Sequence, residues 1–274
     1  MRTQAEGALR EDAFFRRHSV IGYFLLTFGI SWTGALAVAA PDLLRGRGVS
    51  NFTGILIFPA MLLGPSISGI AMTWIVSGRA GVKDLWARMG RGRVPARWYA
   101  VMLIPPALVF VVLYSLKALV SPGFSPNHFW FGVLFGVPAG LLEEIGWTGF
   151  AFPQMSSTQS RLMAAIVLGV FWGIWHLPAI NFLGAAAPHG AYWIQFFLAF
   201  AFAMTAMRVL ISWLYVNTKS VLLAQLMHVS STGTLVVFSP RVSPAQEVIW
   251  YSVYGCVLWA VAGVVAVRGF RREG

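Results

Sequence analysis

The sequence predicts an all-α bundle of about eight membrane-spanning helices, and three observations lead to this fold class. The chain of 274 residues is 58% hydrophobic and only 11% charged, which is too little charge for the surface of a water-soluble domain of this size. Its apolar residues gather in runs of about 20, the length at which a helix crosses a bilayer. Its Lys and Arg residues lie mainly between these runs, as in the loops of a membrane protein.

Eight apolar runs are long enough to be spans, and together they form one transmembrane domain over residues 20–267. The expected spans are residues 20–41, 53–77, 98–118, 128–150, 162–183, 192–214, 219–239 and 247–267. The strands of a β-barrel would be shorter and would alternate between apolar and polar residues, which these runs do not. We therefore expect a single helical bundle.

Two short tails flank this domain. The N-terminal tail, residues 1–19, is polar and mixed in charge, and the C-terminal tail, residues 268–274, is basic. The apolar run that follows the first tail is longer than the apolar core of a signal peptide. We therefore expect this run to remain in the protein as the first spanning helix.

The basic residues indicate the orientation of the bundle, because cytoplasmic loops are enriched in Lys and Arg. With an even number of spans and both termini cytoplasmic, four basic residues lie outside, Arg45, Arg47, Lys117 and Arg241, and Arg208 lies within a span. The other fifteen are then cytoplasmic: Arg2, Arg10, Arg16, Arg17, Arg79, Lys83, Arg88, Arg91, Arg93, Arg97, Arg161, Lys219, Arg268, Arg271 and Arg272. We expect this topology in a bacterial inner, or plasma, membrane.

The same topology accounts for the net charge of +11. In a soluble protein this charge would suggest a nucleic-acid partner, but here the basic residues punctuate apolar runs instead of forming a patch. Membrane lipid is therefore the expected partner, and nucleic acid is not. The single cysteine, Cys256, excludes an intrachain disulfide and a cysteine-based metal cluster, and nothing in the sequence indicates an oligomeric state.

Four ionisable residues inside the predicted spans require an explanation, because a charged side chain in a bilayer costs about 2.5–3.5 kcal/mol on insertion scales. Glu143 and Glu144 lie in the fourth span, His176 in the fifth and His228 in the seventh. Adjacent helical positions point about 100° apart, so the two acids should border one polar cavity from different directions. An acid pair that merely reaches water near a helix end is the alternative explanation.

The two histidines lie in distinctive local sequences. Pro178, two residues after His176, has no N–H and interrupts the hydrogen-bond ladder, so that a bend could aim the imidazole inward. A polar stripe at helical spacing surrounds His228 and consists of Gln225, His228, Ser231 and Thr232. Each histidine alone could be a hydrogen-bonded interior residue, and the hydroxyls could simply join helices.

The four residues are more specific as a set, because two carboxyls and two imidazoles from three spans can converge only if those helices pack together. At about 1.5 Å per residue, Glu143 and His228 both lie roughly 13–15 Å from the expected cytoplasmic ends of their helices, whereas His176 lies at roughly 21 Å. The first two depths match and the third is greater. Such a set is typical of general acid and base catalysis.

Three ordered segments carry these residues and read Glu143-Glu144-x-x-x-Thr148, Trp172-x-x-x-His176 and His228-x-x-x-Thr232. They resemble the motifs of the CPBP family of CAAX proteases and bacteriocin-processing (Abi) proteins, which includes the type II CAAX prenyl endopeptidases. Members of that family read Glu-Glu-x-x-x-Arg, Phe-x-x-x-His and His-x-x-x-Asn. The resemblance covers a core of about residues 128–239 and implies an intramembrane protease.

The resemblance also implies roles for the site residues in the hydrolysis of a peptide bond. Glu143 would act as general base for a water, His176 would help to position that water, and Glu144 would support Glu143. His228, with weaker help from Thr232, would polarise the scissile carbonyl or stabilise its oxyanion. The implied substrate is a membrane-associated peptide or a lipidated protein.

The chain departs from the family motifs at three positions, with Thr148 for Arg, Trp172 for Phe and Thr232 for Asn. Because Thr148 stands four residues after Glu144, the acid pair lacks the basic neighbour that its relatives have within the motif. Thr232 offers one hydrogen-bond donor where an amide offers two. These departures affect the support of the acids and the stabilisation of an oxyanion.

Several alternatives stay open from the sequence. The reaction could need no cofactor, or a divalent metal such as zinc could be held by Glu143, Glu144, His176 and His228, although the stronger His-Glu-x-x-His signature is absent. The chain could also be a non-catalytic immunity or assembly factor that holds a peptide without cutting it. A proton-coupled transporter is a further class, which internal repeats would favour, and none is visible.

Overall fold

A computed structural model of the chain describes residues 18–183 and 189–270. Every regular element within these ranges is a helix, which confirms the predicted all-α class. Residues 1–17 of the expected N-terminal tail and residues 271–274 of the expected C-terminal tail lie outside the described residues, as do residues 184–188. The cytoplasmic position expected for six arginines therefore stays a prediction: Arg2, Arg10, Arg16, Arg17, Arg271 and Arg272.

The helices follow one another with short connections. In chain order they are α2 (Ser19–Leu44), α3 (Asn51–Met89), α4 (Arg97–Ala100), η1 (Val101–Leu103), α5 (Ile104–Leu119), η2 (Pro122–Phe124), η3 (Trp130–Gly132), α6 (Val133–Gly146), η4 (Trp147–Ala151), α7 (Phe152–Ser156), α8 (Arg161–Trp175), α9 (Leu177–Leu183), η5 (Gly190–Tyr192), α10 (Trp193–Thr218), α11 (Val221–Phe238) and α12 (Pro244–Gly269).

Seven segments are long and apolar enough to cross a membrane, and they correspond to seven of the eight predicted spans. They are Ser19–Leu44, Phe52–Met89, Arg97–Leu119, Arg161–Ile180, Gly190–Thr218, Val221–Phe238 and Pro244–Val267. The predicted span at 128–150 differs, because it consists of η3, α6 and the π-helical turn η4 in succession. The structure therefore agrees closely with about eight spans and shows that the acid-bearing one is irregular.

Serine side chains begin four of the long helices. Ser50 accepts a hydrogen bond from a first-turn N–H of α3, Ser160 from one of α8 and Ser220 from one of α11. Ser243 begins α12 with a capping box, in which its side chain and that of Gln246 each accept a backbone N–H of the other. These hydroxyls satisfy donors that have no partner within a helix, so the sequence fixes where the helices start.

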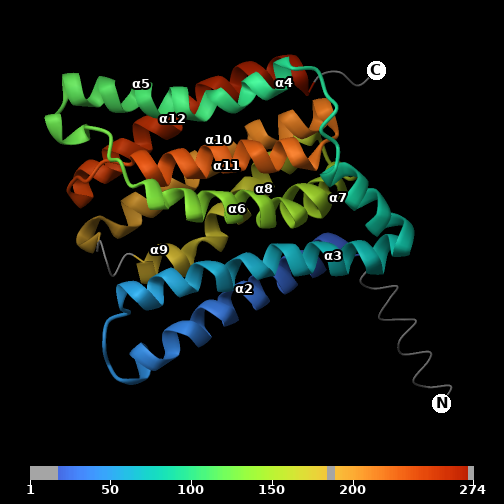
Figure 1. The fold of residues 1–274 in the computed structure, drawn as a ribbon, viewed down its shortest axis with the longest axis horizontal. Helices are drawn as coiled ribbons and strands as arrows, with labels where there is room; N and C mark the ends of the chain where they lie inside the picture. The colour runs from blue at the N-terminus through green and yellow to red at the C-terminus, as the bar shows by residue number, and fades with distance from the viewer. Residues whose placement is uncertain (1–17, 184–188, 271–274) are drawn as a thin grey trace.

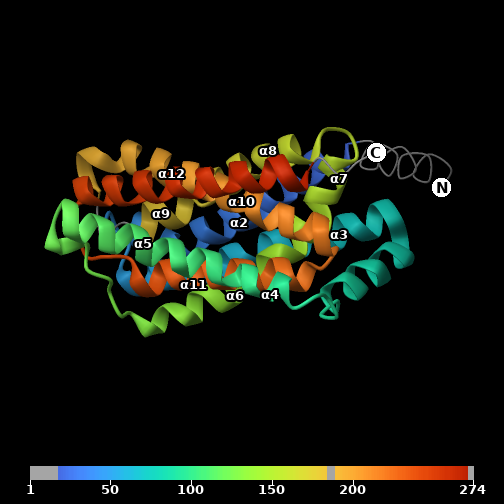
Figure 2. The same cartoon turned by 90° about the horizontal axis from the view of Figure 1, so that it is seen from above.

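The long helices lie side by side along the long axis of the molecule (Figures 1 and 2). The pair α2 and α3 forms one edge of the bundle, and α5 and α12 lie at the opposite edge (Figure 1). Between the edges, α6 packs on both α3 and α11, while α8 packs on α10. The segments that carry the predicted site residues, α6, α8 and α11, therefore meet in the middle.

Helix α3 bends after its apolar part. Gly78 has φ 59° and ψ −154°, a conformation that side chains with a Cβ rarely adopt, and it divides the helix at this point. The part that follows carries charged residues and turns back across the end of the bundle, where Leu85 is buried and Arg88 donates to the hydroxyl of Tyr215 at 2.9 Å (Figure 1). The predicted span at 53–77 therefore covers the helix up to this bend, whereas the apolar segment long enough to cross a membrane is Phe52–Met89.

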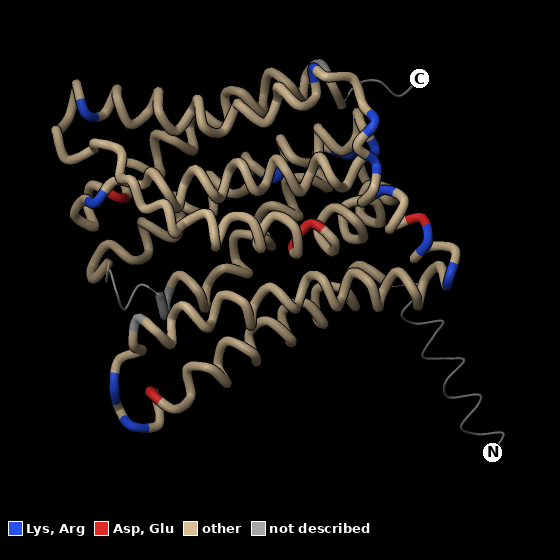
Figure 3. The backbone as a smooth tube through the Cα atoms, in the orientation of Figure 1, with Lys and Arg blue, Asp and Glu red and all other residues tan. Residues whose placement is uncertain are grey.

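Most Lys and Arg residues lie near the two ends of the bundle (Figure 3). More of them lie at the end where α3 bends, and the middle is nearly free of them (Figure 3). This separation is what the predicted topology requires, since it keeps basic side chains near the membrane surfaces. The assignment of the richer end to the cytoplasm stays a prediction.

Two glycines of α6 bring the acid-bearing helix close to α11. A Cβ added at Gly136 would lie 2.5 Å from the Cα of Gly233, and one added at Gly140 would lie 2.6 Å from the backbone nitrogen of Val229. The glycines are four residues apart and so lie on one face, the small-xxx-small arrangement that lets membrane helices approach closely. This contact sets the distance between the acids on α6 and His228 on α11.

We predict that Gly136→Val lowers the stability of the folded protein by about 1–3 kcal/mol, because the added side chain forces α6 and α11 apart. Thermal unfolding in detergent measures the effect. Gly263→Val on α12 is the matched control, since a Cβ at Gly263 meets nothing within 4 Å. Equal unfolding temperatures for the two variants would contradict the close packing of α6 on α11.

Candidate active site

The acid pair lies at the end of α6, where the helix changes its winding. Glu143 is 2% exposed and Glu144 is fully buried. The next five residues, Trp147–Ala151, form a π-helical turn, which often occurs at functional sites. Pro153 follows this turn and has no N–H to continue an α-helical ladder. The sequence thus places two acids deep in the bundle beside an irregular stretch of backbone.

Glu144 is held through both carboxylate oxygens. Arg208 of α10 donates from its two terminal nitrogens, at 2.7 Å to Oε2 and 2.8 Å to Oε1, in a bidentate pair. The Nδ1 of His228 lies 2.7 Å from Oε1, and the hydroxyl of Thr148 donates to Oε2. A charge-assisted bidentate pair is among the strongest hydrogen-bonded contacts in proteins, so the position of Glu144 is fixed.

Glu143 points in another direction and is held less tightly. Its Oε2 accepts the indole N–H of Trp172 at 2.8 Å and that of Trp147 at 3.2 Å. Among the described residues, its Oε1 accepts no hydrogen bond. The two adjacent acids therefore face different partners, as the 100° between neighbouring helical positions predicted, and only Glu143 keeps an oxygen available.

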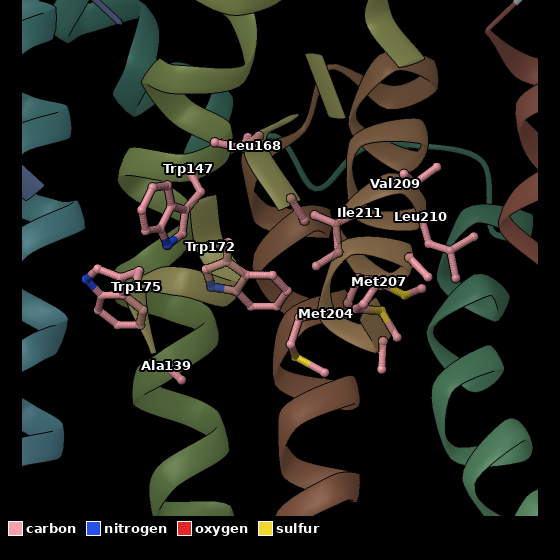
Figure 4. Close-up of a cluster of buried hydrophobic side chains, with 14 of the residues drawn as sticks. Ala139, Trp147, Leu168, Trp172, Trp175, Met204, Met207, Val209, Leu210 and Ile211 are labelled. Carbon is pink, nitrogen blue, oxygen red and sulfur yellow. The ribbon is translucent and has the colours of Figure 1, made fainter. Parts of the chain in front are cut away.

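Trp172 is the side chain around which the site is arranged. Its ring centroid lies 5.4 Å from that of His176 and 5.1 Å from that of His228, and the guanidinium carbon of Arg208 lies 4.3 Å from it. Its indole also extends from the neighbourhood of Trp147 and Trp175 toward Met204 of α10 (Figure 4). One buried indole thus contacts α6, α10 and α11 from its place on α8.

His176 lies at a break between two helices. Helix α8 ends at Trp175 and α9 begins at Leu177, as the proline at 178 predicted. The Nδ1 of His176 lies 2.7 Å from the carbonyl oxygen of Trp172, and because a carbonyl can only accept, this nitrogen carries the proton. In the neutral ring, Nε2 is then the acceptor.

The sequence predicts that His176 lies deeper than the acids, but its ring and the carboxylate of Glu143 both contact Trp172. His228 shows the same pattern as His176, because its Nδ1 meets a carboxylate oxygen and must donate to it. The Nε2 of His228 is therefore the nitrogen that could face a substrate.

Thr232 and Gln225, two further residues of the predicted polar stripe, make no hydrogen bond to the acids or the histidines among the residues that the structure describes. Thr232 is half-buried, one turn after His228 on α11, and its side chain makes no hydrogen bond within the described part of the chain. Gln225 of the same stripe donates to the carbonyl oxygen of Leu141 at 2.6 Å and so joins α11 to α6. The structure brings together Glu143, Glu144, His176 and His228, and among the described residues no side-chain hydrogen bond joins Thr232 to them.

Glu144 is not available to a metal ion in this arrangement. Both oxygens of Glu144 are engaged, and the cation beside them is the guanidinium of Arg208. The Nδ1 atoms of both histidines donate to oxygen acceptors within the protein, which leaves each Nε2 open, as it is in histidines that bind a metal through that nitrogen. Across residues 18–183 and 189–270, no group of three or more His, Cys, Asp and Glu side chains is arranged to hold a metal.

Sequence reasoning missed two functional features, Arg208 and the indole N–H of Trp172. The expectation that the acid pair has no basic neighbour holds only within its own motif, because Arg208 reaches Glu144 from 64 residues away along the chain. The burial cost of a lone Arg inside a predicted span was the available signal. Trp172 replaces the family's Phe and provides a donor to Glu143 that Phe does not have.

The fold and the site define a class of protein: a multi-pass helical membrane protein with a buried site made of carboxylates, imidazoles and a guanidinium. Residues 125–234 match the family model described as Type II CAAX prenyl endopeptidase Rce1-like. The chain is also 31% identical over 138 residues to "CAAX prenyl protease 2" of Methanococcus maripaludis. These matches confirm the predicted resemblance to CAAX-type proteases of the CPBP family.

The similarity covers the middle of the chain. The alignment with the M. maripaludis protein includes 46% of this chain and 51% of that relative, so the chain spans about half of the relative's length. The matched residues 125–234 contain all four ionisable site residues and Arg208. The region of similarity is therefore the region that forms the site.

We predict that Trp172→Phe destabilises the protein by about 1–3 kcal/mol, because it keeps an aromatic ring but removes a buried donor from a carboxylate. Thermal unfolding in detergent measures the effect. In the control, Trp259→Phe, the lost indole N–H donates to a neutral carbonyl, that of Phe202, at a more exposed place. A loss for Trp172→Phe no larger than for Trp259→Phe would argue against the hydrogen bond to Glu143.

Proposed function

We propose that this protein is an intramembrane endopeptidase that hydrolyses peptide bonds with a water activated by Glu143. The observation that carries the proposal is the unequal bonding of the two acids. Glu144 is engaged at both oxygens, whereas Glu143 is fixed at Oε2 and keeps Oε1 for another partner. A general base needs an oxygen within reach of the proton that it removes, and Glu143 meets this requirement.

The first step uses Glu143 and His176. The carboxylate of Glu143 takes a proton from water while the hydroxide attacks the carbonyl carbon of the substrate. The Nε2 of His176 accepts a hydrogen bond from the other O–H of that water, which stays intact, since its Nδ1 is held by the carbonyl of Trp172. When the C–N bond breaks, Glu143 returns its proton to the leaving amine, so the carboxylate is regenerated.

His228 supports the charge that develops on the carbonyl oxygen. Its Nδ1 is fixed by Glu144, so the ring can carry a second proton on Nε2 and donate it as a hydrogen bond to the oxyanion. Glu144 acts here as the buried acid that orients an imidazole, a role known from other hydrolytic sites. Thr232, one turn further along α11, adds a weaker donor from its hydroxyl.

The substrate is a membrane-associated or lipidated peptide that meets the site from the basic end of the bundle. The M. maripaludis relative is named as a prenyl protease, which makes a lipidated C-terminus one candidate. At that end, a hollow of about 280 Å³ lies beside the π-helical turn and is lined partly by Gly149, Phe150 and Tyr215. We place this end toward the cytoplasm of a bacterial inner, or plasma, membrane.

We expect Glu143→Gln to lower the rate of cleavage by a factor of at least about 10²–10⁴, the contribution of a general base, while the protein stays folded. The measurement compares peptide termini in membranes from cells that express the wild-type chain or the variant. It tests cleavage and identifies substrates together.

Glu247→Gln is the matched control for this variant. Glu247 is paired with His189 at 2.8 Å and belongs to α12, outside the matched region, so its loss should leave cleavage intact. Full activity of Glu143→Gln would refute the peptidase assignment. If the Glu143→Gln variant also restores the cellular role in a deletion strain, the protein would be a peptide-binding factor. Substrate flux into liposomes that contain the purified protein would test the transporter alternative.

We expect activity to survive chelation of divalent metals, because Glu144 is paired with Arg208 and the described residues contain no group of three or more His, Cys, Asp and Glu side chains arranged to hold a metal. Metal analysis of an active preparation, before and after treatment with 1,10-phenanthroline, is the measurement. Stoichiometric zinc that leaves together with the activity would show that the metal-free mechanism is wrong.

A further inference from the structure

Arg208 is a buried cation to which the mechanism above gives no role. It lies within α10 and is fully buried, and residues 203–212 around it are buried as well. A guanidinium in this apolar setting is unfavourable unless charged and polar partners surround it. Its two terminal nitrogens both bind the carboxylate of Glu144.

The guanidinium contacts both halves of the site. Through Glu144 it is connected to His228, whose Nδ1 shares the oxygen Oε1 with it. Through its face it stacks on Trp172 at 4.3 Å, and the indole N–H of Trp172 holds Glu143 at 2.8 Å. Arg208 therefore touches the groups that orient the base and the oxyanion donor, without touching the free oxygen of Glu143.

Thr148 meets Arg208 at the same place. Its hydroxyl donates to Oε2 of Glu144, the oxygen that Arg208 also binds, and it lies 3.4 Å from a terminal nitrogen of Arg208. Position 148 is one helical turn after Glu144, so a long basic side chain there could reach the same carboxylate. Positions 148 and 208 thus approach one oxygen from different helices.

The backbone is arranged for this approach from α10. A Cβ added at Gly169 would lie 2.8 Å from the Cα of Thr205 and 3.1 Å from the Cβ of Arg208, so α8 and α10 are close together here. Gly169 and Trp172 are three residues apart on α8 and share a face. The glycine lets α10 come near enough for the guanidinium to lie over the indole.

We infer that Arg208 is the positioning residue of this site, a cation that α10 supplies across helices in place of a basic residue at position 148. It fixes Glu144, His228 and Trp172, and it acts on the reaction only through them. The inference rests on the proposed peptidase function for its effect on catalysis, and on the geometry alone for its effect on His228.

The test compares three variants in lipid nanodiscs: Arg208→Met, Arg208→Lys and the exchange Thr148→Arg with Arg208→Thr. We expect Arg208→Met to lower kcat by about 100-fold, with a smaller change in KM, because the groups that orient the reaction lose their support. Arg208→Lys keeps the charge but not the planar fork, and should fall between Arg208→Met and the wild type. The exchange variant should recover most of the lost kcat.

A second readout does not depend on activity. In ¹⁵N-histidine NMR spectra, the wild type should show a hydrogen-bonded proton on Nδ1 of His228, because Glu144 accepts from that nitrogen whether or not Nε2 also carries a proton. Arg208→Met should lose this Nδ1 signal, because the carboxylate of Glu144 is no longer fixed, and the exchange variant should restore it. His189, which is bonded through Nε2 to Glu247, is the internal control and should not change.

The possible outcomes separate the inference from the proposed function. An Arg208→Met variant that folds and keeps its kcat overturns the inference. So does an exchange variant that folds but has no activity and shows no hydrogen-bonded proton on Nδ1 of His228. If the wild type cleaves no peptide, the proposed function fails, and the His228 spectra still decide the inference. If Arg208→Met does not fold, Arg208→Lys and the exchange variant provide the same comparison.

Discussion

The carboxylate of Glu144 and the guanidinium of Arg208 are both fully buried in the bundle, and burial of either charge alone would be unfavourable. The pair of Glu144 and Arg208 joins α6 to α10, two helices that are distant in sequence. Such a buried pair adds little net stability, because both groups lose their hydration, but removing one partner leaves an uncompensated charge. The pair therefore matters more for fixing one arrangement of the helices than for holding the fold together.

The surrounding scaffold makes this arrangement possible. Gly136 and Gly140 let α6 approach α11, and Gly169 lets α8 approach α10, so that four helices meet at one depth. Trp172 lies between them and contacts Glu143 through its N–H, and Arg208, His176 and His228 through its ring. Close packing by small residues and one large indole thus replaces the hydrophobic effect that would bring such helices together in water.

The two adjacent acids differ because they face different helices. Glu144 meets a guanidinium and an imidazole and is fully engaged, whereas Glu143 meets two indoles and keeps one oxygen available. Two identical residues, neighbours in the chain, thereby acquire different hydrogen-bond partners. This chain has Thr148 where the motif of the CAAX-type proteases has an arginine, and the cation beside Glu144 is Arg208 from another helix.

The sequence by itself determined the helical membrane class, six of the spans to within a few residues and the set of four ionisable residues, because hydropathy, charge and burial cost are local properties. It could not assign Arg208 to Glu144 or Trp172 to Glu143, nor show that the acid-bearing span contains a π-helical turn. Those features depend on which helices pack together and how closely. Only the tertiary structure decided them, since a residue's partners across helices are set by packing and not by its neighbours in the chain.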